Sequence, residues 1–316
     1  MKWEKLGHIF DPTKIKLPKD CFAFAKSPQA IVFDDYIRIY YCATQKDTQD
    51  KLLCRIFYVD FTKDFSKIIN HSNGEVISLG ALGSFDEHGI FPFNVVKEKD
   101  KIRAYTTGWS RRVSVSVETA IGYAESFDGG ESFVKNGDGP IVSTNLKEPF
   151  LVCDAFVYKE NSTFYMFYIF GTKWSEETEI PERVYKIAMA TSDDGINWIR
   201  NSKPIIQNFI GKDECQALPT VIKINSRYHM YFSYRHMTGF RNQKGKGYQL
   251  GYAYSDDLFH WIRDDENKGI ELSASGWDSE MMCYPNIFSV DNEVYMLYNG
   301  NSFGKYGFGL AKLIDV

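Results

Sequence analysis

The sequence lacks the features that mark membrane, secreted or nucleic-acid-binding proteins. Its first residues, MKWEKLGHIFDPTKIKLP, contain no apolar signal segment, and no other run in the 316 residues approaches the length needed to span a bilayer. A formal net charge of -4 gives no electrostatic reason to expect nucleic acid or an anionic membrane as a partner. We therefore expect a cytoplasmic protein that binds neither.

Cysteine is scarce and scattered. No CxxC pair and no histidine at zinc-ligand spacing accompanies the six residues, which are Cys21, Cys42, Cys54, Cys153, Cys215 and Cys283. In a chain without an export signal, single cysteines are most simply buried free thiols. The sequence predicts no metal site and no cofactor.

Long helical periodicity is lacking as well, and a repeated β pattern takes its place. A strand of small and apolar residues, a Ser/Asp-rich turn and an aromatic residue recur as IGYAESFDGGESF (121–133), KIAMATSDDGINW (186–198) and QLGYAYSDDLFHW (249–261). We interpret the aspartate pairs at 193–194 and 256–257 as structural turn residues. Short repeated β units must stack on one another to bury their faces, which predicts a β-propeller.

The repeats divide the chain into five modules. In each, an apolar run leads through a short polar turn into an alternating aromatic strand, which is the pattern of a β-hairpin. With 44% hydrophobic and 16% aromatic residues, the chain can bury a sizeable core. We predict an all-β, single-domain, five-bladed β-propeller over residues 1–316, with blades at roughly 27–66, 88–135, 151–200, 214–263 and 280–313.

Acidic residues recur near the start of the first strand in four of the five modules. The innermost strands of a propeller surround a common funnel, so residues in this phase should converge there. The four acids are Glu87, Asp154, Glu214 and Glu280, and the first module has Ser27 in their place. We predict that Asp154, Glu214 and Glu280 share one funnel, with Ser27 and Glu87 on its wall.

At these positions the chain resembles the five-bladed propeller glycosidases of glycoside hydrolase families 32 and 43, which include invertases, levanases, arabinanases and xylosidases, and more distantly the mannoside phosphorylases. Glu214-Cys215 resembles the Glu-Cys motif, whose glutamate is the general acid. Val152-Cys153-Asp154-Ala155 resembles the Arg-Asp-Pro segment, whose aspartate stabilises the transition state. The resemblance implies these roles for Glu214 and Asp154.

The chain departs from the family in the first module. Where the family has Asp-Pro-Asn-Gly with its nucleophile or base, this sequence reads Ser27-Pro28-Gln29-Ala30. Glycoside hydrolysis needs two carboxyl groups, and a serine cannot replace the second unassisted. Either Glu87, His88 or Glu280 supplies the base, or the protein performs another step, as mannoside phosphorylases do when phosphate attacks directly.

Basic and aromatic residues complete the predicted site. Arginine grips phosphate or carboxylate in a bidentate fork, and tryptophan faces can stack on sugar rings. The predicted substrate-binding residues are Ser27, Gln29, His88, Trp109, Arg111, Arg112, Trp174, Arg235, His236 and Tyr284.

The leading functional prediction is a glycoside hydrolase whose substrate is a carbohydrate, with an anionic sugar among the candidates. One alternative is a phosphorylase or glycosyltransferase-like enzyme that uses phosphate or an activated sugar in the same funnel. The other is a carbohydrate-binding propeller without catalysis, which the missing aspartate of the first module favours. The sequence leaves the sugar, the linkage and the oligomeric state open.

Overall fold

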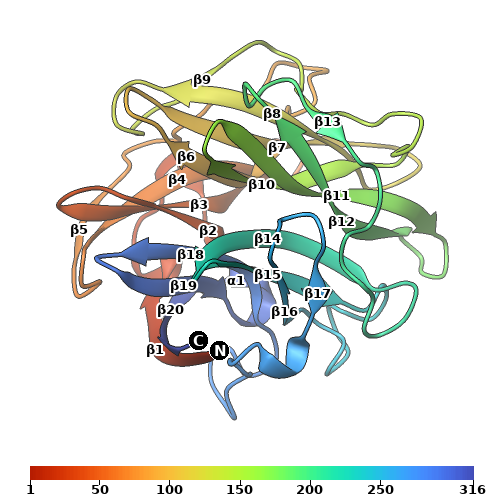
Figure 1. Cartoon of the computed structure of the whole chain (residues 1–316). Coiled ribbons are helices and arrows are strands. Elements are labelled where there is room, and N and C mark those ends of the chain that lie inside the picture. Colours follow the sequence, from red (N-terminus) through yellow and green to blue (C-terminus); the bar gives the residue numbers. More distant parts are fainter.

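The computed structural model describes residues 1–316 and consists almost entirely of β-strands (Figure 1). Its few helical segments are short: η1 (Pro12–Lys14), η2 (Pro18–Asp20), η3 (Asp265–Asn267) and α1 (Asn301–Gly304). None of them is long and apolar enough to cross a membrane. The predicted all-β propeller fold is confirmed.

The first eight strands after β1 form one large sheet. Its first half contains β2 (Ala23–Val32), β3 (Tyr36–Lys46), β4 (Leu52–Thr62) and β5 (Ile68–His71), and its second half β6 (Gly89–Lys97), β7 (Ile102–Arg111), β8 (Val117–Ser126) and β9 (Val134–Lys135). A single parallel bridge between Cys54 and Gly89 joins the halves. Glycine is needed at position 89, because a Cβ there would lie 2.9 Å from that of Cys54.

Three four-stranded sheets complete the ring. Their strands are β10 (Val152–Glu160), β11 (Thr163–Ser175), β12 (Glu182–Ser192) and β13 (Ile199–Arg200); β14 (Cys215–Ile224), β15 (Arg227–Arg235), β16 (Gln249–Ser255) and β17 (Ile262–Arg263); and β18 (Cys283–Val290), β19 (Glu293–Asn299), β20 (Phe308–Asp315) and β1 (Lys2–Phe10). Divided at the Cys54–Gly89 bridge, the sheets make five four-stranded blades, numbered here in chain order. In blade 5 the N-terminal β1 pairs with the C-terminal β20, so the two termini lie side by side (Figure 1).

The repeated Ser/Asp-rich segments form the turns between the third and fourth strands of blades 2, 3 and 4. In the blade 3 turn, Asp194 Oδ1 accepts hydrogen bonds from the backbone N–H groups of Ile196 and Asn197, both at 2.8 Å. Ser192 Oγ accepts from Gly195 N–H at 2.8 Å. The aspartates in these turns therefore stabilise local structure, as interpreted from the sequence.

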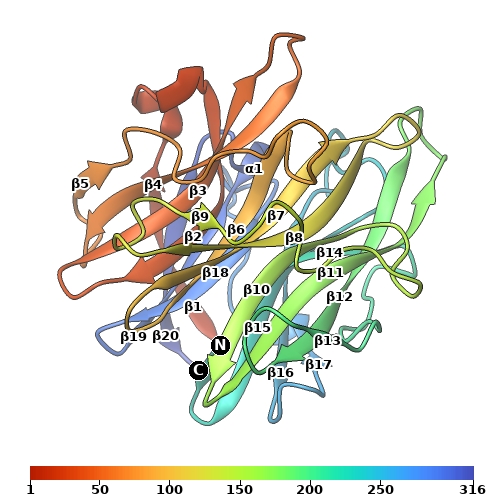
Figure 2. The ribbon, with the colours of Figure 1, turned by 90° about the horizontal axis from the view of Figure 1, so that it is seen from above.

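The first strands of the blades surround the centre of the molecule. They contact one another in a closed ring from β2 through β6, β10, β14 and β18 back to β2 (Figure 2). Polar side chains link the strands of this ring. Gln29 Oε1 accepts hydrogen bonds from Asn94 Nδ2 at 3.1 Å and Asn286 Nδ2 at 3.3 Å. Gln29, predicted to bind substrate, is thus buried between blades.

Each first strand also carries a register irregularity at an equivalent place. In blade 2 it lies within β6, between Ile90 and Phe93. In the other four blades it coincides with a residue of positive φ, namely Ser27, Asp154, Leu218 and Tyr284, with φ between 46° and 58°. Each bulge changes which face of the first strand the following side chains point to, and so decides which of them face the centre of the molecule. Glu214 and Glu280 lie four residues before the positive-φ residues of their strands, and Glu87 lies three residues before Ile90. Asp154 is itself the positive-φ residue of its strand, so the four acids do not share one position relative to the bulges.

Candidate functional site

The central cavity lies where the first strands begin and the second strands end. It has a volume of about 410 Å³ and is lined by residues of every blade. Its walls are mostly aromatic: Phe91 and Tyr248 each pack edge to face on Tyr284, with ring centroids 5.5 Å apart. Of the predicted binding residues, Trp109, Arg235 and Tyr284 line this cavity.

Arg235, the last residue of β15, supplies a buried positive charge to the cavity wall. Its side chain is only 2% exposed and forms no ion pair with a carboxylate. Nη1 donates to the carbonyl oxygens of His236 (2.7 Å) and Met237 (3.0 Å), and Nε donates to Tyr185 Oη (3.1 Å). Phe240 covers the guanidinium at 3.5 Å. The charge is therefore desolvated and has no counter-ion in the protein.

Two further cations of the wall also lack carboxylate partners. Lys26 lies between the rings of Phe24 and Phe91, with Nζ 5.1 and 4.9 Å from their centroids. Arg183 lies 5.6 Å from the ring centroid of Trp109 and donates to a serine hydroxyl at 3.2 Å. Since no Asp or Glu lines the cavity, its charge is positive. Buried charge without a counter-ion is unfavourable, so this cavity is suited to an anion.

Asp154 lies at the bulge of β10, next to the cavity wall. Its backbone N–H donates to Thr107 Oγ1 (2.9 Å), and its Oδ2 accepts from Leu218 N–H (3.3 Å). Burial raises the pKa of Asp154 to about 7, although the nearby positive charge of Arg183 lowers it in part. The carboxyl group therefore keeps its proton to a higher pH than an ordinary aspartate does, which suits a proton donor.

Glu214 lies outside the cavity lining, in a closed hydrogen-bond network of blade 4. Its Oε2 accepts from the backbone N–H groups of Phe209 (2.8 Å) and Ile210 (3.0 Å). Its Oε1 accepts from Gln216 Nε2 (2.9 Å) and Arg263 Nη1 (2.6 Å). A carboxylate saturated in this way anchors the loop before β14, and this position does not fit the predicted role of general acid.

Of the predicted residues of blade 2, only Trp109 lines the cavity. Glu87 Oε2 accepts from a loop backbone N–H at 2.8 Å, and its Oε1 is 3.3 Å from His88 Nδ1. Arg111 forms an ion pair with Asp47 at 2.7 Å, and the exposed Arg112 pairs with Glu118. Their charges are thus already compensated on the surface.

The remaining predicted residues are dispersed. Glu280 is exposed and lines a neighbouring hollow of about 510 Å³. Ser27 is buried, its N–H donates to Asn299 Oδ1 at 2.8 Å, and its hydroxyl has no partner. Trp174 contacts the site through Arg183, at 5.6 Å from its ring centroid. The expected convergence of acidic side chains in one funnel is therefore not observed.

Sequence reasoning missed three residues that line the cavity, namely Arg183, Tyr185 and Tyr248, and it assigned no role to Lys26. Two of them share a pattern that the sequence contains: Arg183 and Tyr185 are two positions apart at the start of β12, so their side chains lie on the same face of the strand. Lys26 directly precedes the Ser-Pro segment that was recognised.

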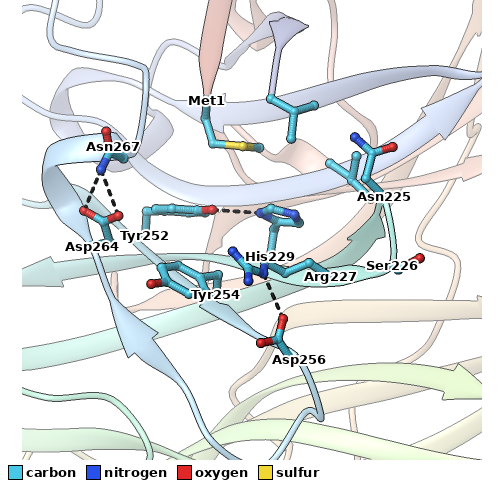
Figure 3. A pocket seen from close by; sticks show the side chains of 12 residues that line it. Met1, Asn225, Ser226, Arg227, His229, Tyr252, Tyr254, Asp256, Asp264 and Asn267 are labelled. Carbon is cyan, nitrogen blue, oxygen red and sulfur yellow. Dashed lines mark hydrogen bonds and ion pairs between the residues drawn. The ribbon is translucent and has the colours of Figure 1, made fainter.

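A larger hollow of about 530 Å³ lies at the opposite end of β15, beside Arg227 (Figure 3). Its polar groups are largely paired with one another. Arg227 pairs with Asp256 at 2.8 Å, and His229 Nδ1 is 2.8 Å from Tyr252 Oη (Figure 3). Because the charge of Arg227 is already paired with Asp256, this hollow offers less to a charged ligand than the central cavity does.

No group of His, Cys, Asp and Glu side chains in the molecule is arranged to hold a metal ion.

Comparisons with known proteins identify relatives over the whole chain. No family model matches. The uncharacterized protein MT1551 of Mycobacterium tuberculosis is 30% identical over 314 residues, which cover 99% of each chain. The β-1,2-mannobiose phosphorylase of Thermoanaerobacter sp. (strain X514) is 32% identical over 132 residues, which cover 38% of this chain and 42% of that protein.

Solved structures match the fold. A glycoside hydrolase has a TM-score of 0.75 at 17% identity, covering 99% of this chain and 92% of that chain. A structure from the GH130 family of mannoside phosphorylases, a family that contains glycoside hydrolases targeting β-1,2 mannosidic linkages in Candida mannan, has a TM-score of 0.67 at 13% identity, covering 98% and 93%. The Bombyx mori GH32 β-fructofuranosidase BmSUC1 has a TM-score of 0.62 at 14% identity, covering 91% and 61%. The resemblance to propeller glycosidases and mannoside phosphorylases is thus confirmed at the level of the fold.

Proposed function

We propose that this chain, which belongs to the same family as the Mycobacterium tuberculosis protein MT1551, is a carbohydrate-active enzyme. In this proposal it cleaves a glycosidic bond by phosphorolysis in the central cavity. The observation that carries this proposal is Arg235, a buried guanidinium with no carboxylate partner. The other charged side chains of the cavity wall are Lys26 and Arg183, which also lack carboxylate partners, and Arg241, which pairs with Glu182. Phosphate would supply the missing negative charge and accept the donors of the guanidinium.

The reaction needs one acid and one nucleophile. Asp154, with its pKa raised by burial to about 7, is the proposed acid and gives its proton to the leaving glycosidic oxygen. A phosphate oxygen attacks the anomeric carbon as the bond to that oxygen breaks, so the products are a glycosyl phosphate and an alcohol. The cations of the wall hold phosphate in place and lower its repulsion from Asp154 once this group is ionised.

Hydrolysis is the second candidate, and it accounts for the site less well. It requires a second carboxyl group to attack or to activate water. Asp154, which lies near Arg183 of the wall, already has the role of acid, no Asp or Glu of the lining itself can provide the second carboxyl group, and Glu214 is engaged with Arg263. An anionic sugar could still occupy the cation site during hydrolysis. The partial match to a β-1,2-mannobiose phosphorylase supports the phosphate-dependent reaction.

The test is a panel of glycosides assayed with and without inorganic phosphate. Phosphate-dependent release of a glycosyl phosphate is expected, whereas turnover in phosphate-free buffer would identify a hydrolase. Phosphate binding is also measurable without a substrate, because a ligand that binds only the folded state raises its melting temperature.

The variant Arg235→Met tests the binding site directly. It keeps a long side chain, removes the charge, and should weaken phosphate binding by roughly 30-fold or more, as loss of one partner of a buried charge pair does. Arg112→Met is the matched control, since this arginine is exposed and lies outside the cavity. Equal phosphate-induced stabilisation of both variants and the wild type would refute the proposed role of Arg235.

A further inference from the structure

One face of blade 1 gathers two thiols, a hydroxyl and an ammonium group beside the cavity. Cys54, on β4, lines the cavity. Thr44 lies directly opposite it on β3, and Cys42 is two residues before Thr44 and so shares its face. Lys26, on β2, pairs with Cys42 in the strand register. The proposed phosphorolysis uses neither thiol.

Lys26 and Cys54 form a polar contact in an otherwise aromatic setting. Nζ lies 3.4 Å from Cys54 Sγ, and Lys26 forms no ion pair with a carboxylate. The Cys54 sulfur is therefore the hydrogen-bond acceptor that the protein itself offers to this ammonium group. The neighbouring Cys42 thiol and the positive charge of Lys26 hold the pKa of Cys54 below its usual range, whereas burial raises the pKa of Cys42, whose Sγ donates to the carbonyl oxygen of Ala43 at 3.5 Å. The two shifts run in opposite directions and favour the thiolate form at Cys54 over that at Cys42.

Thr44 adds a second, independent observation. Its side chain is fully buried, and its hydroxyl has no hydrogen-bond partner. A buried unpaired hydroxyl is unfavourable by roughly 1 to 3 kcal/mol. Since Thr44 faces Cys54 across the strand pair, an oxygen atom on the Cys54 sulfur would provide the acceptor that this hydroxyl lacks.

We propose that Cys54 is an oxidation site, at which a hydroperoxide converts the thiolate to a sulfenic acid whose oxygen is held by Lys26 and Thr44. The sulfur attacks the terminal peroxide oxygen, an S–O bond forms, and the O–O bond breaks. The leaving alkoxide or hydroxide takes a proton from water. Sulfur loses two electrons and the peroxide gains them, so the step is balanced.

The modification changes the cavity. Cys54 and Lys26 both line it, so an oxygen bound to Lys26 occupies space and uses one of the cations proposed to bind phosphate. The oxidised protein should therefore be stabilised less by phosphate. The oxidation itself does not depend on the reaction proposed for the cavity.

The test exposes the full-length chain to hydrogen peroxide at pH 7 with dimedone as a sulfenic-acid trap, followed by peptide mass spectrometry. The adduct should form on Cys54 at least about tenfold faster than on any of the other five cysteines, which are all buried. Adducts spread evenly over several cysteines, or no adduct on Cys54, would overturn the proposal. This measurement needs no variant.

Two variants separate the roles of the neighbours. Lys26→Met should slow adduct formation by about tenfold, because the thiolate loses its counter-ion. Thr44→Val should leave the rate of oxidation unchanged but shorten the lifetime of the sulfenic acid, measured by delayed addition of dimedone. Cys21→Ser is the control and should behave as the wild type. Unchanged oxidation in a folded Lys26→Met protein would overturn the role of Lys26.

Discussion

Replacing Asp154 by asparagine should stabilise the protein, and increasingly so as the pH rises from about 4 to about 8. Asparagine has nearly the same shape, and its carbonyl oxygen can accept the N–H of Leu218 as Asp154 Oδ2 does. Asparagine carries no charge at any pH. The variant therefore removes the ionisation of this buried group while keeping its packing.

The magnitude follows from the difference between the folded and unfolded states. The pKa of Asp154 is about 7 in the folded protein and has a reference value of 3.8. Between these values the unfolded chain is ionised while the folded protein keeps its proton, so the stability of the wild type falls as the pH rises. Three pKa units correspond to about 4 kcal/mol. Below pH 3.8 both states are protonated and this contribution disappears.

The assay is urea unfolding of wild type and Asp154→Asn at several pH values between 4.5 and 8.5. Other titrating groups are common to both proteins, so they cancel in the difference between their free energies of unfolding. Asp194→Asn is the control, because hydrogen bonds from the turn backbone hold the pKa of Asp194 well below its usual range. Its difference from wild type should be constant above pH 5. A constant difference for Asp154→Asn would refute the burial-driven pKa shift.

Two further predictions concern the roles of the carboxyl groups. Phosphate-dependent turnover should fall above pH 7 as Asp154 loses its proton. The variant Asp154→Asn should lower kcat by about 10² to 10⁴-fold. A kcat of the wild type that does not depend on pH would show that Asp154 is not the acid. Glu214→Gln should lower the free energy of unfolding by about 1 to 3 kcal/mol, because Arg263 loses one of its two buried carboxylate partners and keeps Asp265. It should leave kcat unchanged where the protein remains folded. Loss of kcat without loss of stability would return Glu214 to the reaction.

Local patterns in the sequence were sufficient to predict the fold class. Alternating apolar residues and Ser/Asp-rich turns determine strands and turns through contacts between residues that are close in the sequence. The turn at Asp194, for example, is stabilised by hydrogen bonds from backbone N–H groups only two and three residues away. Three predicted binding residues, Trp109, Arg235 and Tyr284, line the cavity. They could be predicted because the same alternation shows where the strands begin and end. Repetition of such units then predicts that blades stack around a centre.

Only the tertiary structure decided which acids enter the site. The bulges at Ser27 and Asp154 change the phase of the central strands, and no alternation pattern marks them. Glu214 is paired with Arg263, which lies 49 residues later in the sequence. The pKa of Asp154 is raised because folding buries its carboxyl group. Periodicity reports which face of a strand is buried, whereas pairing and desolvation depend on chain segments that meet only after the ring has closed.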